Sequence, residues 1–329
     1  MSKVHAVIDA KGELPSRERV DMAVRSWGTI PGYVRMFGIG YAALVTGQER
    51  KHWEDILALS DDGMLREWRR RLDAAAIPST EEVVTKLQAS GIEKVAVHAV
   101  QPLEPGHWDY RRGNDELGAM VGRFPDFVIG FANVNVFDGP AALDEVRRAH
   151  GEVGLRGLKV TPPFFKLTAD DDRLLPFYAL CQELGLIVWL HCGTHWRNEF
   201  RMDATHPTRV DRIACAHPDL RIIAGHAGWP WVLDAVVVAW RHKNVYLDIS
   251  AHRPKHFAAP GSGWEPLLRF GDTTIRNKVL FGTSWDILGL PMRQLIDEVR
   301  ALPLRPDTVE AWLYGNGAKL FRADATELA

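Results

Sequence analysis

Two stretches of the sequence decide the fold, Leu186–Gly193 (LIVWLHCG) and Arg221–Gly228 (RIIAGHAG). In each stretch a short apolar run ends on a histidine, His191 or His226, and a glycine follows two residues later. A continuous apolar run of this length is typical of a parallel strand that is covered on both faces. Because barrel enzymes carry their chemistry at the carboxyl ends of such strands, each stretch predicts a strand that presents an imidazole to a ligand site.

Similar runs occur along the rest of the chain. From Pro78 onward, short β runs alternate with helical patterns, which is typical of βαβ units and a parallel sheet. Eight strands with alternating helices predict a closed (β/α)8 TIM barrel rather than an open sheet. The predicted strands are Val4–Asp9, Lys94–Val100, Phe127–Val134, Gly157–Thr161, Leu186–His191, Arg221–His226, Val245–Ser250 and Lys278–Ser284.

The connection after the first strand is abnormally long. Residues 11–78 separate that strand from the regular alternation, whereas such loops usually contain about 2–6 residues. The segment is too apolar for a disordered linker, so we expect it to be an inserted lid or cap over the barrel mouth. A purely structural cap or a dimer contact is an equally good reading. We expect residues 1–329 to form a single barrel domain. The aromatic residues of the insertion are Trp27, Tyr33, Phe37, Tyr41, Trp53 and Trp68.

Composition narrows the class of protein. A formal net charge of −2 provides no broad field that would attract nucleic acid or an anionic membrane. The three cysteines show no spacing typical of a disulfide framework, and no apolar run has the length of a signal peptide or a spanning helix. We therefore expect a cytoplasmic protein whose partner is a small molecule. The apolar insertion and the 12 tryptophans also favour a homo-oligomer, most simply a dimer.

Five motifs in order support a family resemblance. From about Pro78 to Phe321 the chain resembles the amidohydrolase-related proteins, and within them the aminocarboxymuconate semialdehyde decarboxylase and dihydroxybenzoate decarboxylase branch. The motifs are Gly157–Pro163 (GLKVTPP), His191–Gly193 (HCG), Gly225–Gly228 (GHAG), Asn244–Ser250 (NVYLDIS) and Leu280–Trp285 (LFGTSW).

The resemblance implies one divalent metal at the barrel mouth. In the family, strand one ends in an Asp-x-His-x-His or Glu-x-His pattern, strand five gives a histidine ligand, strand six a histidine acid or base, and strand eight an aspartate. His191 and His226 match this set. Lys11 and Glu13 stand where the two ligands of strand one belong, and Ser284 replaces the aspartate of strand eight.

These replacements favour a site without a metal. An ammonium has three donors and no lone pair, so Lys11 repels a divalent cation and fits better as its electrostatic substitute. The alternative is that Glu13, His191 and Asp286 supply three ligands for zinc or manganese and leave a fourth position for water. We therefore favour no cofactor and keep one divalent metal as the alternative.

The candidate catalytic residues are His226, Lys11 and Asp286. Imidazole is well matched to proton transfer near neutral pH, which makes His226 the candidate general acid or base. Arg253 is a candidate carboxylate clamp, although an exposed arginine without a function is the commoner outcome. Lys159 is a second candidate for binding a carboxylate, and a structural salt bridge is an equally good interpretation of this residue. The full set of candidate substrate-binding residues is Glu13, Lys159, His191, His195, Trp196, His252, Arg253 and Ser284, with His98 and Gln101 as second-rank candidates and Asp248 as a residue that fixes a neighbour.

Two reactions fit this set of residues. The first is non-oxidative decarboxylation of a small aromatic or unsaturated carboxylic acid, with Lys11 or Arg253 binding the acid and His226 or Asp286 protonating the carbon. The second is hydrolysis of a lactone, amide or C–C bond, with water activated by His226. A third possibility is a non-catalytic binding or scaffold homologue, but convergent polar groups at the strand ends favour an enzyme, a carboxy-lyase or hydrolase.

Overall fold

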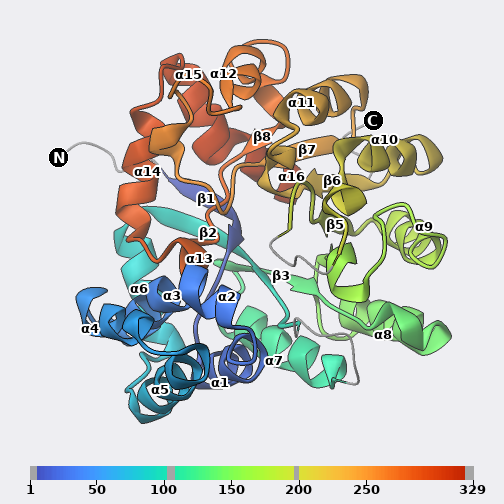
Figure 1. The fold of residues 1–329 in the computed structure, drawn as a ribbon. Coiled ribbons are helices and arrows are strands. Elements are labelled where there is room, and N and C mark those ends of the chain that lie inside the picture. The colour runs from blue at the N-terminus through green and yellow to red at the C-terminus, as the bar shows by residue number, and fades with distance from the viewer. Residues whose placement is uncertain (1–5, 102–107, 196–199, 323–329) are drawn as a thin grey trace.

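Eight parallel strands form one sheet whose spatial order follows the chain, from β1 to β8. The computed structural model describes residues 6–101, 108–195 and 200–322. The Ala10 amide donates to the Phe281 carbonyl oxygen at 2.8 Å, and the Thr283 amide donates to the Lys11 carbonyl oxygen at 3.1 Å. These bonds join β1 to the segment that follows β8, so the predicted (β/α)8 barrel is confirmed (Figure 1). The strands are β1 Val7–Gly12, β2 Ile92–His98, β3 Val128–Ala132, β4 Gly157–Val160, β5 Ile187–Leu190, β6 Arg221–Ala224, β7 Val245–Asp248 and β8 Val279–Leu280.

The first strand differs most from its prediction. It runs over Val7–Gly12 rather than Val4–Asp9, and residues 1–5 lie outside the described part of the chain. The extension has a structural cause, because the backbone carbonyl of Lys11 accepts from the chain beyond β8 and so holds this end of the strand in the barrel. Lys11 therefore lies within the strand and not in the loop after it.

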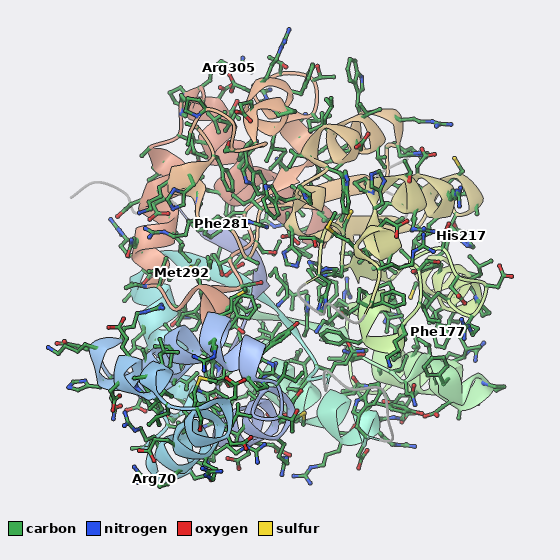
Figure 2. The ribbon with its side chains drawn as sticks, viewed as in Figure 1. Arg70, Phe177, His217, Phe281, Met292 and Arg305 are labelled. Atoms are coloured by element: carbon green, nitrogen blue, oxygen red, sulfur yellow. The ribbon has the colours of Figure 1, made fainter. Side chains whose placement is uncertain are left out.

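Helices surround the barrel on its outer side, as Figure 1 shows. Their apolar faces pack against the outward side chains of the strands in one large buried cluster. Phe281 and Met292, labelled in Figure 2, belong to this cluster, whereas Arg70 lies at the periphery. The helices that follow the insertion are α6 Thr80–Ala89, α7 Tyr110–Arg123, α8 Pro140–Gly151, α9 Leu175–Glu183, α10 Pro207–Ala216, α11 Val232–Arg241, α12 Glu265–Gly271, α13 Trp285–Leu288, α14 Met292–Arg300, α15 Pro306–Glu310 and α16 Asn316–Arg322.

The inserted segment folds into helices with a core of its own. This core contains Trp53, Trp68 and Ile56, each at most 1% exposed, and is separate from the barrel core. The Trp68 indole N–H donates to the Gly38 carbonyl oxygen at 2.9 Å. The insertion is thus well packed in itself, while its role as a lid stays a prediction. Its helices are α1 Arg17–Trp27, α2 Pro31–Tyr33, α3 Ile39–Thr46, α4 Lys51–Glu54 and α5 Asp61–Ala74.

Inside the barrel, a small apolar cluster fills the space below the strand ends. It includes Phe131 of β3, Ile187 and Trp189 of β5, Ile223 of β6 and Tyr246 of β7. Because strand side chains alternate, the neighbours of these residues face the helices instead. Among the described helices, none is both long enough and apolar enough to cross a membrane.

Candidate active site

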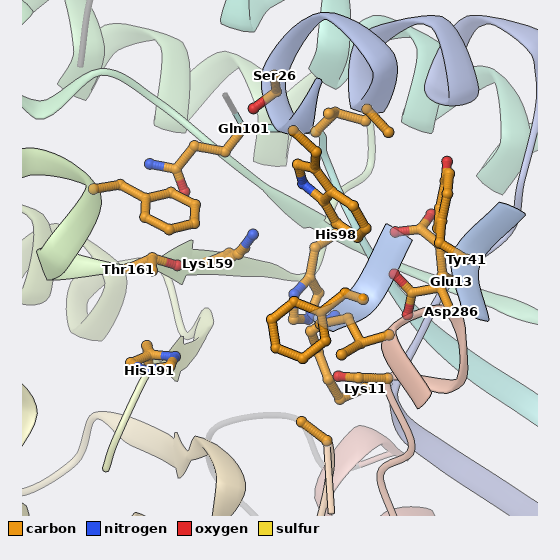
Figure 3. A pocket seen from close by; sticks show the side chains of 18 of the residues that line it. Lys11, Glu13, Ser26, Tyr41, His98, Gln101, Lys159, Thr161, His191 and Asp286 are labelled. Atoms are coloured by element: carbon orange, nitrogen blue, oxygen red, sulfur yellow. The ribbon is translucent and has the colours of Figure 1, made fainter. Parts of the chain in front are cut away.

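A cavity of about 280 Å³ lies at the carboxyl ends of the strands. The barrel and the insertion both line it, and the insertion contributes Arg19, Trp27, Tyr33 and Tyr41. Figure 3 shows Tyr41 on the same side of the cavity as Glu13 and Asp286. The predicted strand-end position of the site therefore agrees with the position of the cavity. The predicted site residues that line it are Lys11, Glu13, Lys159, His191, His195, His226, His252, Ser284 and Asp286.

The Trp189 ring lies at the barrel side of the cavity. Its centroid lies 5.0 Å from that of His98 and 5.4 Å from that of His226. Gly225 allows this position, because a Cβ there would lie 2.5 Å from the indole ring. The Trp189 indole N–H donates to the Asp248 carboxylate at 2.6 Å, so Asp248 fixes a neighbouring side chain as expected. The result is a rigid aromatic surface below the histidines.

Lys11 extends from β1 into the cavity. Its side chain is 9% exposed, and its ammonium nitrogen lies 5.7 Å from the centroid of the Trp189 ring, within the range of a cation–π contact. No carboxylate of the described residues lies within ion-pair distance of this ammonium. Lys11 therefore presents a positive charge that no described anion neutralises at close range.

Glu13 is held by an arginine of the insertion. Arg19, on α1, is 4% exposed; its Nε lies 2.6 Å and its Nη2 lies 2.5 Å from Glu13 Oε1. Arg19 Nη2 also donates to the His98 carbonyl oxygen at 2.6 Å. This guanidinium thus fixes the Glu13 carboxylate and joins the insertion to the end of β2.

We predict that Arg19→Met lowers the free energy of unfolding by about 2 kcal/mol, because it leaves the partly buried Glu13 carboxylate without its cation. The double variant Arg19→Met/Glu13→Gln should lose less. Urea unfolding measures both. Arg70→Met is the matched control, since the Arg70–Glu67 pair is exposed and should contribute about 0–1 kcal/mol. Equal midpoints for Arg19→Met and the wild type would contradict the structural role of this pair.

Asp286, at the start of α13, is a buried carboxyl group that also lines the cavity. Burial raises its pKa to about 6; the charge of Lys11 opposes this shift and the charge of Glu13 adds to it. Figure 3 shows Asp286, Glu13 and Tyr41 gathered on one side of the cavity. A carboxyl group with this pKa carries its proton over part of the near-neutral range and can act as a general acid.

Lys159, on β4, contributes a second ammonium group to the cavity. Burial and, to a smaller extent, the charge of Lys11 lower its pKa to about 7. Its ammonium nitrogen lies 5.8 Å from the centroid of the Phe164 ring. As for Lys11, none of the residues that the structure describes forms an ion pair with it, so the structural salt bridge that we weighed is not observed.

His226 follows β6 in a left-handed backbone conformation, with φ 60°. Its Nδ1 lies 3.1 Å from the Ser250 carbonyl oxygen and 2.9 Å from the Ser250 hydroxyl oxygen. A proton on Nδ1 can be donated to the carbonyl oxygen, which only accepts, and this tautomer leaves the lone pair on Nε2. Burial and, to a smaller extent, the neighbouring His252 lower the pKa of His226 to about 3. This imidazole is therefore neutral near pH 7, where it can accept a hydrogen bond but is a weak base and cannot act as a cationic acid.

His191 and His226 face each other at the ends of neighbouring strands, with ring centroids 4.9 Å apart. Burial also lowers the pKa of His191 well below its usual value. His195 lies beyond them, 5.2 Å from His191, and its Nε2 lies 3.2 Å from the Tyr33 hydroxyl oxygen. The structure thus brings His191, His195 and His226 together at the mouth of the barrel.

Arg253 lies outside this arrangement. Its guanidinium pairs with Glu298 of α14, and it is not among the residues that line the cavity. We therefore assign it no contact with substrate. Trp196, a further predicted contact, lies outside the described residues. Ser284 lines the cavity in a left-handed conformation with φ 45°, a backbone strain of the kind that is often found at functional sites.

Several buried polar atoms around the cavity lack a hydrogen-bond partner among the described residues. Such atoms are rare in folded proteins because each one costs free energy, so their concentration here indicates that a polar ligand completes the site. They are Arg19 Nη1, His98 Nδ1 and Nε2, Gln101 Nε2, Thr161 Oγ1, Ser284 Oγ and Asp286 Oδ1.

The sequence analysis does not identify Arg19 or Trp189 as residues of the site. Arg19 lies in the insertion, whose placement against the barrel leaves no periodic signal in the sequence. Trp189 was quoted only as part of an apolar strand; its position two residues before His191 places it on the same side of the strand, which is a usable signal.

The alternative metal ligands Glu13, His191 and Asp286 do not converge. Figure 3 shows Glu13 and Asp286 on one side of the cavity and His191 on the other. Over the part of the chain that the structure describes, one group of donor atoms lies within 4.8 Å of one another, namely Asp211, Cys215 and His242 on the outer side of the barrel. With two ammonium groups in the cavity and Glu13 bonded to Arg19, the mouth residues do not fit a divalent metal.

Comparison with known proteins agrees with the barrel and its motifs. The sequence model of the amidohydrolase family matches residues 81–323. The gamma-resorcylate decarboxylase of Rhodococcus jostii (strain RHA1) is 28% identical over 193 residues, which cover 48% of this chain and 56% of that protein. The chain thus aligns with only about half the length of this curated relative.

Solved structures share the fold over almost the whole chain. The 5-carboxyvanillate decarboxylase of Sphingomonas paucimobilis has a TM-score of 0.64 at 17% identity, covering 97% of this chain and 100% of that one. The dihydroxybenzoic acid decarboxylase of Polaromonas sp. JS666, solved with bound manganese and the inhibitor 2-nitroresorcinol, has a TM-score of 0.65 at 18% identity and covers 98% of this chain and 99% of that one. At these identities the likeness concerns the fold.

Proposed function

This chain belongs to the amidohydrolase family, and from that premise we propose that it is a non-oxidative decarboxylase of a small aromatic or unsaturated carboxylic acid. The observation that carries the proposal is the pair of ammonium groups, Lys11 and Lys159, that face one cavity without an ion-pair partner among the described residues. Two such charges favour an anionic ligand. The decarboxylases among the relatives support the same reaction.

The proposed reaction uses three groups of the cavity. Asp286, in its protonated form, donates its proton to the carbon that carries the carboxylate. The carbon–carbon bond then breaks, its electron pair returns to the ring or double bond, and CO2 leaves; water restores the proton to Asp286. His226 Nε2 accepts a hydrogen bond from a substrate hydroxyl, and Lys11 and Lys159 hold the carboxylate. The charge of Lys11 also stabilises the Asp286 carboxylate that forms as the proton leaves.

We further propose that this site works without a resident metal. The manganese of the structural neighbour supports the opposite view, in which one divalent ion is bound. Against it stands the donor set, because Lys11 places a cation where a ligand would be needed and the three alternative ligands do not converge. Lys11 would then supply the positive charge that a metal supplies elsewhere.

Hydrolysis is the weaker candidate. It requires a base that activates water, and a His226 with a pKa of about 3 is a poor general base near neutral pH. A scaffold role is weaker as well, because a scaffold has no use for buried polar atoms that lack partners around a cavity.

A substrate screen tests the proposal. Purified protein is incubated with resorcylate- and carboxyvanillate-type hydroxybenzoic acids and with unsaturated amino-carboxylic acids, and released CO2 is measured beside a parallel set of lactones and amides. We expect CO2 from at least one acid and no hydrolysis. Hydrolysis without CO2, or tight binding of acids with no turnover, would refute the decarboxylase proposal.

A further inference from the structure

Helix α11 presents an apolar face to solvent. Leu233, Val237 and Trp240 are 52%, 50% and 57% exposed, and their spacing of four and three residues places them on one stripe. The opposite face of the helix is buried against the barrel. Figure 1 shows α11 on the outside of the barrel between α10 and α12.

This concentration of apolar side chains is unusual for the molecule. Of the exposed large hydrophobic side chains in the described part of the chain, the other four are scattered over the insertion and the loops, at Met36, Leu59, Phe137 and Met202. Helix α14, also on the outside of the barrel, is more typical, because its exposed positions carry Arg293, Gln294 and Asp297. A grouped apolar stripe of this kind marks an interaction surface.

Charges at the two ends of the stripe indicate the partner. The other exposed positions of α11 are Asp234 in its first turn and Arg241 in its last, and their side chains are 51% and 62% exposed. When two copies of one helix pack antiparallel about a two-fold axis, residue i meets j and residue j meets i. An axis near Val237 then sets Asp234 against the partner's Arg241, and the same pair repeats on the other side.

We propose that two copies of this chain associate through α11, with Val237 at the two-fold axis. Leu233 of one copy packs against Trp240 of the other, so the three apolar side chains of each copy are covered. The Trp240 ring, whose centroid lies 6.0 Å from that of Phe270 on α12, extends the contact to the neighbouring helix. Two symmetric Asp234–Arg241 pairs fix the antiparallel direction, because in a parallel arrangement Asp234 and Arg241 would lie about two helical turns apart and could not pair.

Asp234 and Arg241 have contacts within their own chain, but these contacts leave both side chains available to pair across the proposed interface. Asp234 lies 3.8 Å from His206, and Arg241 lies 3.1 Å from Asp211, but both side chains remain largely exposed. Because α11 lies on the outer side of the barrel, the interface leaves the cavity at the strand ends open. The proposal is therefore independent of the proposed reaction.

The oligomeric state of the full chain tests this interface. Sedimentation velocity at micromolar concentration should give a dimer for the wild type. Val237→Arg sets two guanidinium groups against each other at the axis and should raise the dimer dissociation constant by about 100-fold or more, since hot-spot changes at the centre of an interface have effects of this size. Leu59→Arg, at an exposed apolar residue outside the stripe, is the matched control and should remain dimeric.

Charge reversal tests the orientation. Asp234→Arg and Arg241→Asp should each weaken the dimer by about tenfold, whereas the double variant should regain most of the wild-type affinity because the pairs re-form with opposite sign. Circular dichroism confirms that each variant is folded, which is expected since the changed positions are exposed. A monomeric wild type, or a Val237→Arg protein that stays as dimeric as the control, would overturn the proposal.

Discussion

Replacing Lys11 with methionine should lower kcat/KM for the decarboxylated acid by about 10²–10³-fold while the protein stays folded. Loss of one preorganised charge at the point where negative charge develops has an effect of this order. Methionine fills a similar volume, so the change removes the ammonium and little else. Steady-state CO2 release measures the effect, and Lys51→Met, at an exposed lysine of the insertion, is the matched control.

The Lys11 variant has a second readout that simple damage to the site would not give. The charge of Lys11 lowers the pKa values of both Asp286 and Lys159. In Lys11→Met both values should therefore rise, and the residual activity should extend to higher pH than in the wild type. Full activity in this variant, or an unchanged pH profile, would show that Lys11 is not the electrostatic centre of the site.

Asp286→Asn should reduce kcat by about 10²–10⁴-fold, since asparagine keeps the shape of the side chain but cannot deliver a proton to carbon. Acid binding should persist, because Lys11 and Lys159 are intact; isothermal titration with the substrate measures it. Asp272→Asn, at a carboxylate that Arg305 holds on the outer surface, is the control. An Asp286→Asn enzyme with wild-type kcat would exclude Asp286 as the proton donor.

The pH dependence of kcat/KM in the wild type follows from the ionisation of Asp286. Asp286 acts in its protonated form, and its pKa is raised to about 6, so kcat/KM should be level below this value and fall about tenfold per pH unit above it. Deprotonation of Lys159, with a pKa of about 7, should weaken acid binding at higher pH. A profile that rises from pH 5 to pH 8 would contradict both assignments.

The strand ends were predictable because apolar runs and glycines mark them locally. His191 and His226 were placed at the mouth from sequence alone, and the cavity contains both. The partners of Glu13 and Arg253 were not predictable. Arg19 pairs with Glu13 only because the insertion folds so that α1 lies beside the end of β1. Arg253 pairs with Glu298, which lies on a helix 45 residues further along the chain. Such pairings depend on tertiary placement, which residue type and spacing do not encode.

The central claim is that Lys11 replaces a metal at the barrel mouth. Its most direct test is CO2 release by protein treated with a chelator, with the metal content of the same sample measured in parallel. Cys215→Ser protein is included, so that any ion held by the outer Asp211–Cys215–His242 group is not attributed to the mouth. The account predicts undiminished turnover at far less than one metal ion per chain. Activity that the chelator abolishes and manganese or zinc restores, in both the wild type and Cys215→Ser, would contradict it.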